Sequence, residues 1–120
     1  MANQIGNMIA PSCSLGLLYA KRLLQDISAS DFARFAQPGG QLVVSNHPAF
    51  IFGHLSLYAV RIVHDLKGDV SSVAVPQSFD CLFSKDATCQ DDVDSTIYPA
   101  KEAILDHFFR GYELAEQLLK

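Results

Sequence analysis

Four histidines are the residues of this chain best suited to chemistry, and His54 is the most informative of them. It lies within an apolar segment, 48–58, that begins with a proline and that Ser45 or Asn46 could cap as a helix. A helix that only filled a core would carry an aliphatic residue at this position. We therefore expect His54 to be either a core histidine, held by a hydrogen bond to a carbonyl or a tyrosine hydroxyl, or a metal ligand facing a cavity shared between helices.

The spacing of the histidines limits which of them could share one ion. His47 and His54 are seven residues apart, which places them on one helix face but about 10.5 Å apart along its axis. Metal–nitrogen bonds are only about 2.0–2.1 Å long, so these two side chains do not readily share an ion. His64 is farther away, and beside Asp65 it gains from the helix dipole. His107 lies on a later helix and could approach His54, with packing at the edge of an apolar stripe as its alternative role.

The other reactive residue types give weaker signals. The three cysteines are an odd number without metal-site spacing, which favours a reduced, cytoplasmic setting and a role as small buried hydrophobic residues rather than nucleophiles. They are Cys13, Cys81 and Cys89. The acidic residues of 86–94 lack the ligand order and central glycine of a calcium loop, so we interpret that segment as a solvated loop. No glycine-rich phosphate loop and no Gly-x-Ser-x-Gly elbow is present.

Composition narrows the class of protein. A chain of 120 residues with 49% hydrophobic residues suggests one folded domain, 1–120. The net charge is −4, and the nine Lys and Arg residues form no run, which argues against nucleic acid or an anionic membrane surface as a partner. The first residues do not resemble a signal peptide, and no apolar stretch is long enough to span a membrane.

Hydrophobic periodicity predicts three long amphipathic helices, at 8–27, at 46–67 and from about residue 95 to the end of the chain. Shorter helical turns are expected after residue 28 and at 78–83, where phenylalanines would dock onto the core. The two β-branched stretches, 42–44 and 72–75, are interpreted as extended coil because two such short segments would form only a marginal ribbon. The sequence therefore predicts an all-α, up-down helical bundle.

The last predicted helix runs to Lys120 without a cap or a tail. Three amphipathic helices alone would leave an apolar groove exposed to water. We therefore expect either that a partner chain covers the groove or that part of the protein lies outside this sequence. Isologous packing of the last helix is one way for a second copy to cover it.

The segment Pro-Ala-Phe-Ile-Phe-Gly-His-Leu at 48–55 resembles the second helix of the DinB/YfiT-like family of metal-dependent four-helix proteins. Residues 8–20 are similar to the first helix of one branch of that family, and the aromatic-rich segment 107–112 is similar to its third helix. The likeness extends diffusely over most of the chain. Its Gly-His-Leu element is moderately specific in this context and weak alone.

The resemblance implies a bundle in which three histidines surround one divalent metal, with zinc, nickel and iron not distinguished. One ligand would be His54, and the other two normally come from a fourth helix that this sequence lacks. We therefore expect a domain that is incomplete at its C-terminal end, in which the metal is not fully coordinated. Within the chain, His107 is the further candidate ligand, and Tyr58 and Phe50 are candidates to line a pocket.

The resemblance also implies a function. We expect a metal-dependent transferase or isomerase that uses a low-molecular-weight thiol, or a hydrolase of small molecules, with the open metal position acting as a Lewis acid or activating a thiol or water. No residue is assigned as the general base. The alternative is a non-catalytic helical protein that forms a homodimer through exposed apolar helix faces.

Overall fold

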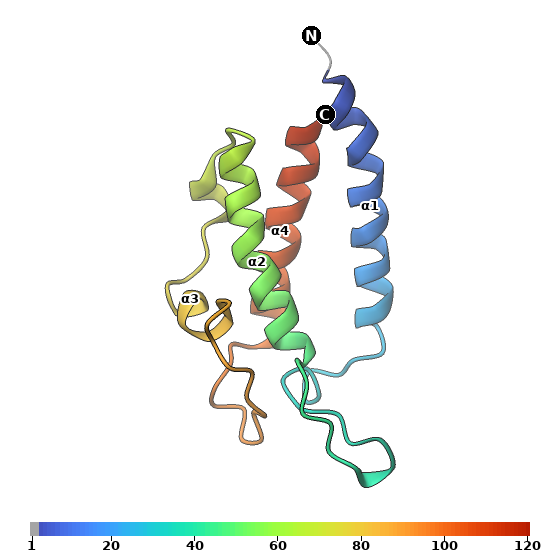
Figure 1. Ribbon diagram of the computed structural model, residues 1–120, viewed down its shortest axis with the longest axis vertical. Coiled ribbons are helices and arrows are strands. Elements are labelled where there is room, and N and C mark those ends of the chain that lie inside the picture. Colours follow the sequence, from blue (N-terminus) through green and yellow to red (C-terminus); the bar gives the residue numbers. More distant parts are fainter. Residues whose placement is uncertain (1–2) are drawn as a thin grey trace.

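The computed structural model describes residues 3–120, which form helices joined by long connections (Figure 1). Their bounds are α1 Gln4–Leu24, η1 Pro38–Gly40, α2 Pro48–Asp65, η2 Val70–Val73, α3 Ser78–Phe83 and α4 Lys101–Leu119, where η marks a short 3₁₀ helix. No strand occurs between residues 3 and 120, so the predicted all-α class is confirmed. The segment 42–44 is extended coil as expected, whereas residues 72 and 73 of the segment 72–75 belong to η2. No helix among these residues has both the length and the apolarity needed to cross a membrane.

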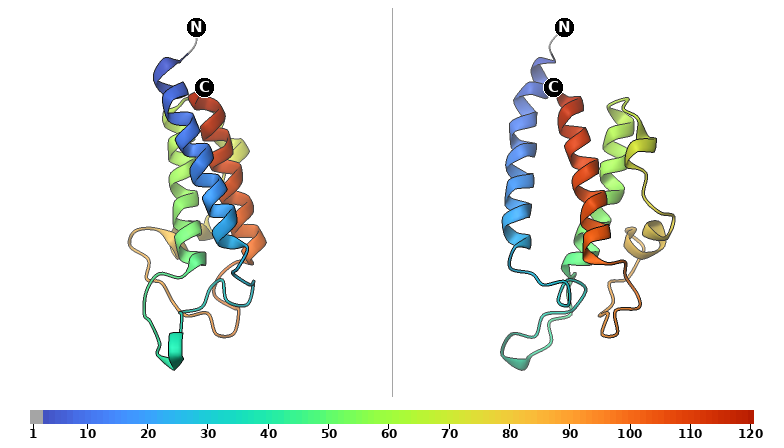
Figure 2. Two further views of the ribbon diagram at one scale, coloured as in Figure 1. Left: turned by 90° about the vertical axis from the view of Figure 1, so that its right-hand side faces the viewer. Right: turned by 180° about the vertical axis from the view of Figure 1, so that it is seen from behind.

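The three long helices lie side by side, with α4 packed against both α1 and α2 (Figures 1 and 2). Within residues 3–120, no close backbone contact joins α1 to α2. Helices α2 and α4 run in the same direction, opposite to α1, which is not the simple alternation of an up-down bundle (Figure 1). The physical reason is the connection from 66 to 100, which carries the chain back along α2 through η2 and α3 before α4 begins.

The helix boundaries differ from the predicted ones where a capping side chain was not recognised. Helix α1 begins at Gln4, four residues earlier than predicted, because the side chain of Asn3 accepts a hydrogen bond from the Gly6 N–H at 3.1 Å. Helix α2 is capped by neither Ser45 nor Asn46. Its cap is His47, whose Nδ1 accepts a hydrogen bond from the Phe50 N–H at 3.1 Å.

Helix α4 begins at Lys101, later than predicted, because Asp92 engages the preceding backbone. The Asp92 carboxylate accepts hydrogen bonds from the N–H groups of Thr96, Ile97 and Tyr98 at 2.9 to 3.2 Å. Burial acts to raise the pKa of Asp92, but these three backbone donors outweigh it and hold the pKa below its ordinary value. Asp92 is thus a buried anchor, and interpreting the whole acidic segment as solvated was wrong at this residue.

The core consists of three apolar clusters. The largest gathers around Phe32, Phe79, Phe83 and Ile104, where α2, α3, α4 and the connections meet. A second surrounds Phe108, with residues of α1 on one side and of α2 on the other, and a third joins α2, η2 and α4. These clusters bury the apolar stripe of α4, including Ile104 and Phe108. Isologous packing through α4 is therefore not available, because its stripe is already covered within one chain.

Candidate functional site

His54 lies in the middle of α2 and is half-buried. Its Nδ1 is 2.7 Å from the carbonyl oxygen of Phe83, the last residue of α3. The ring of Phe83 lies directly against Gly53, where an added Cβ would come within 2.5 Å of the ring. The His54 ring also stacks on Phe50 and meets Tyr58 edge-on, with centroid separations of 6.2 Å and 5.0 Å. The Gly53–His54 pair thus forms the seat on which α3 docks.

The hydrogen bond to Phe83 determines what the other ring nitrogen can do. A carbonyl oxygen only accepts, so Nδ1 of His54 carries the hydrogen and donates it. Among residues 3–120 no hydrogen bond engages Nε2 of His54, and the one buried side-chain nitrogen or oxygen without a partner is Nδ1 of His107. Nε2 of His54 therefore keeps access to solvent or to a ligand.

Two hollows meet at His54, and together we call them the His54 cleft. The first has a volume of 430 Å³, and the second, of 170 Å³, adjoins it. His54 and Lys85 line both hollows, Phe50 lines the first, and Tyr58 and Arg61 line the second. All the lining residues belong to α2, to its N-terminal approach or to residues 84–87, so the cleft lies on the outer side of α2 and not in a cavity between the long helices.

The residues around Nε2 do not fit a divalent metal ion. Within residues 3–120, no group of three or more His, Cys, Asp or Glu side chains is arranged to hold one. The charged groups that line the His54 cleft are Lys85 and Arg61, and both would repel a cation. A three-histidine site at His54 therefore needs two ligands from beyond these residues, and the metal expected from the resemblance stays a prediction.

His107 does not join His54 in a ligand group. It lies on α4 and packs edge-on against Phe79 near the beginning of α3, with ring centroids 5.1 Å apart. Its Nδ1 is buried without a hydrogen-bond partner among residues 3–120. The surroundings of His107 thus match a role in packing. Its unpaired nitrogen lowers the stability of the fold locally and does not belong to a group of ligands.

The other two histidines differ from each other. His47 is only 3% exposed, and both ring nitrogens are used, because Nε2 donates to the carbonyl oxygen of Gln90 at 2.8 Å while Nδ1 caps α2. Sequence reasoning missed this role, since Gln90 is 43 residues away in the chain. His64 is exposed, 3.4 Å from Asp65, as its position near the helix end suggested.

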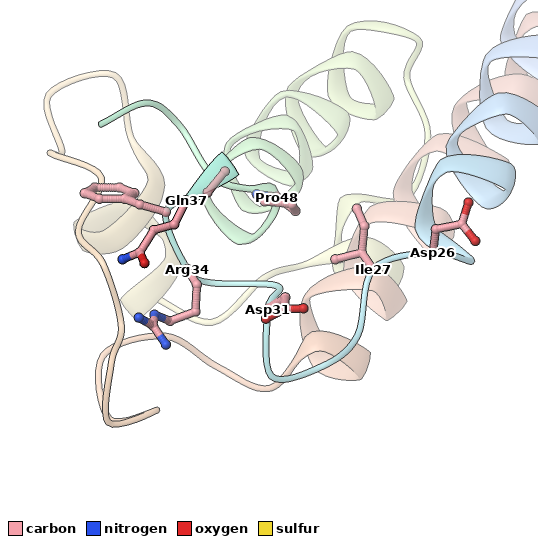
Figure 3. A pocket seen from close by; sticks show the side chains of 8 residues that line it. Asp26, Ile27, Asp31, Arg34, Gln37 and Pro48 are labelled. Atoms are coloured by element: carbon pink, nitrogen blue, oxygen red, sulfur yellow. The ribbon is translucent and has the colours of Figure 1, made fainter. Parts of the chain in front are cut away.

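A hollow of 540 Å³ lies along the connection between α1 and α2 (Figure 3). Asp26, Asp31 and Arg34 provide its charged groups, and Pro48 at the start of α2 forms part of its wall. The Nε of Arg34 is 2.7 Å from the carboxylate of Asp91, which also accepts the Phe35 N–H at 3.0 Å. Because Arg34 is committed to holding this connection, the hollow offers no converging set of free groups.

The cysteines show no sign of nucleophilic chemistry. Burial raises the pKa of Cys13, and the nearby Glu116 carboxylate raises it further. Burial likewise raises the pKa of Cys89, although hydrogen bonds from the His47 backbone and the Tyr98 side chain act against it. Cys81 is exposed, so the expectation that all three would be small buried residues was wrong there.

A broad apolar surface lies open on α1 and α2. On each helix the residues recur at alternating steps of four and three, and most are exposed. We call them the association face: Ile5, Ile9, Ser12, Gly16, Tyr19 and Leu23 of α1, with Ile51, Leu55, Tyr58 and Ile62 of α2. Ile5 is 72% exposed, Leu23 is 68% exposed, and Met8 beside them is 78% exposed.

The two halves of the association face lie on helices that both pack against α4. On α4, the Tyr112 hydroxyl donates to the Leu55 carbonyl oxygen of α2 at 2.9 Å. Burial raises the pKa of Tyr112 to about 12. On α1, Ser14 and Lys21 reach Glu116 and Glu113 on the far edge of α4. The apolar edge of α1 therefore lies on the side of α2.

Comparison with known proteins does not add an identity to this geometry. No family model matches the chain, and no curated protein and no solved structure matches it significantly.

Proposed function

We propose that this chain is a helical protein that forms a homodimer through its association face. The observation that carries this proposal is the exposure of two apolar stripes on neighbouring helices, α1 and α2. Soluble monomers rarely expose a continuous apolar patch of more than a few hundred Å². Such a surface is typical of a protein–protein interface.

The spacing within the association face favours a helix as its occupant. Steps of four and three residues give an average repeat of 3.5, which is the repeat of a coiled-coil seam. Both α1 and α2 present such a seam to solvent. Ser12 and Gly16 stand in the middle of the α1 seam, and their small size allows close approach of another helix.

The distribution of charge favours a second copy of the chain. With a net charge of −4, two copies repel each other, and a surface without charged residues is where they meet at the least electrostatic cost. The association face has no charged residue, whereas the exposed positions of α4 include Glu102, Asp106 and Glu113. The side chains of the face leave on the order of 1,000 Å² exposed, comparable with the roughly 800 Å² that each partner contributes to a stable interface.

A two-fold symmetric arrangement covers the apolar stripes of both α1 and α2. The α1 helix of each copy would lie over α4 of the other, between its α1 and α2, so that each stripe meets an apolar partner. Each chain would then supply a fourth long helix to the three of its partner. This arrangement uses the same surface twice, as an isologous interface requires.

The proposal is tested by placing one charge in the centre of the seam. Gly16 suits this purpose because a Cβ there meets no atom within 4 Å, so Gly16→Glu does not disturb the fold of the single chain. We expect light scattering to give a dimer for the wild-type protein and a monomer for Gly16→Glu. Gln117→Glu, with the same charge change at an exposed position of α4, is the matched control and stays dimeric. A monomeric wild type, or a dimeric Gly16→Glu, would contradict the proposal.

The metal-dependent function implied by the resemblance has narrower support. It rests on the unengaged Nε2 of His54, whose ring is oriented by a carbonyl in the way that metal-bound histidines commonly are. Metal analysis of the purified wild type and of His54→Ala is the test. A stoichiometric metal that disappears in His54→Ala would support it, and a metal-free wild type would contradict it.

A further inference from the structure

The His54 cleft is a second candidate binding site, which borders the association face and shares Ile51, Leu55 and Tyr58 with it. We propose that it binds a small carboxylate with an apolar body. Its polar wall includes His54, Lys85 and Arg61, and its apolar wall includes Phe50 and Leu55. The proposal depends on this juxtaposition of two cations and an imidazole with a hydrocarbon surface.

The charge of the cleft selects for an anion. Lys85 and Arg61 line it, no acidic residue does, and neither cation forms an ion pair with another residue in 3–120. Five of the other seven lysines and arginines are engaged elsewhere: Lys21, Arg34, Arg110 and Lys120 in ion pairs, and Lys101 with the carbonyl oxygens of Leu24 and Ile27. In a chain with a net charge of −4, two unpaired cations beside one hollow form a local positive site.

His54 adds a directed group to this positive site. Its ring is fixed by the donation from Nδ1 to Phe83, so Nε2 is the nitrogen left for a ligand. A protonated ring donates from Nε2 to a carboxylate oxygen, while a neutral ring accepts from a protonated acid. The same surroundings disfavour a metal ion, because the positive charges of Lys85 and Arg61 oppose a second cation.

The walls of the cleft distinguish a carboxylate from a phosphate. The hollow of 430 Å³ has Phe50, Ile51 and Leu55 along one side, which favours a ligand with a hydrocarbon portion. A free phosphate is strongly hydrated and would leave that apolar side uncovered. A monocarboxylate would place its charge beside His54 and Lys85, which line both hollows, and its apolar body against α2.

Benzoate is a suitable probe, with benzamide as its uncharged counterpart of nearly equal shape. We expect benzoate to shift the backbone NMR signals of 46–61 and 84–87 in a saturable manner, and benzamide and inorganic phosphate to bind at least tenfold more weakly. Arg61→Gln/Lys85→Gln should weaken benzoate binding at least tenfold. The matched control is Arg22→Gln/Lys67→Gln, which removes two cations that also lack ion pairs in 3–120 but lie outside the cleft.

Three outcomes would overturn the carboxylate proposal. They are shifts that do not saturate, equal binding of benzamide or phosphate, and an equal loss of affinity in the control double variant. The oligomeric state of Arg61→Gln/Lys85→Gln, measured on the same samples, keeps the two proposals apart. A dimer that has lost benzoate binding supports both, while a monomeric wild type that binds benzoate supports the carboxylate site alone.

Discussion

The Nδ1 atom of His54 and the carbonyl oxygen of Phe83 are 2.7 Å apart, so the imidazole holds the C-terminal end of α3 against α2. The last carbonyl groups of a helix have no partner within that helix, and this bond satisfies one of them. The same hydrogen bond also fixes the orientation of the His54 ring in the His54 cleft. One hydrogen bond therefore links the packing of α3 to the chemistry available at the surface.

Replacing His54 should loosen α3. For His54→Ala we expect a loss of about 1–2 kcal/mol in the free energy of unfolding, because the Phe83 carbonyl loses its partner and the Phe50 and Tyr58 rings lose a neighbour. Urea unfolding followed by circular dichroism measures it. His64→Ala is the control, since His64 is exposed and should change stability by less than about 0.5 kcal/mol. Equal effects of the two substitutions would contradict this role for His54.

Gly53, in the seat on which α3 docks, and Gly16, on the exposed face of α1, offer a second comparison. Gly53→Ala should destabilise the fold by about 1–3 kcal/mol, because its Cβ would come within 2.5 Å of the buried Phe83 ring. Gly16→Ala should stabilise the isolated chain by up to about 1 kcal/mol, because it adds helix propensity where no atom lies within 4 Å. Thermal unfolding of both variants, at a protein concentration at which the chain is monomeric, is the measurement, and changes of the same sign would be inconsistent with this packing.

His47→Ala should be more damaging than His54→Ala. It removes the cap of α2 and leaves the Gln90 carbonyl oxygen without its donor in a buried setting. We expect a loss of about 2–4 kcal/mol from these two effects together with the cavity. His47→Asn, which can still accept from the Phe50 N–H, should recover part of the loss. If His47→Asn and His47→Ala unfold at the same urea concentration, the capping role is wrong.

The lowered pKa of Asp92 predicts that the stability of the fold depends on pH in acid. Its pKa is lowered in the folded protein, so its contribution to stability is fully present above the pKa of about 3.9 in the unfolded chain. That contribution is lost as the pH falls through the lower pKa of the folded state. Asp92→Asn should therefore be less stable at pH 7 and show a flatter dependence of stability on pH below about 4. Parallel pH dependences of the two proteins would rule out this anchoring role.

Periodicity within the chain was enough to predict the all-α class and the three long helices, because the apolar stripe of each helix is a local property. The hydrogen-bonded alternative for His54 is also confirmed at Nδ1. The sequence does not reveal which side chains and backbone groups far apart in the chain form hydrogen bonds with each other. His47 meets Gln90 across 43 residues, and Asp92 binds a backbone turn that delays the start of α4.

Periodicity predicted an exposed apolar surface but could not place it on a particular helix. The stripe of α4 is the most regular in the sequence, but α1 and α2 cover it within the chain. The stripe of α1 is wide enough to face α4 with one edge and water with the other. Deciding which edge is covered requires the packing of all three helices.

In the proposed dimer, a second copy of this chain covers the association face. Sedimentation equilibrium of the wild-type protein over micromolar concentrations tests this directly. We expect a molar mass of twice the 13.1 kDa of the chain. A mass equal to that of a single chain throughout this range would contradict it.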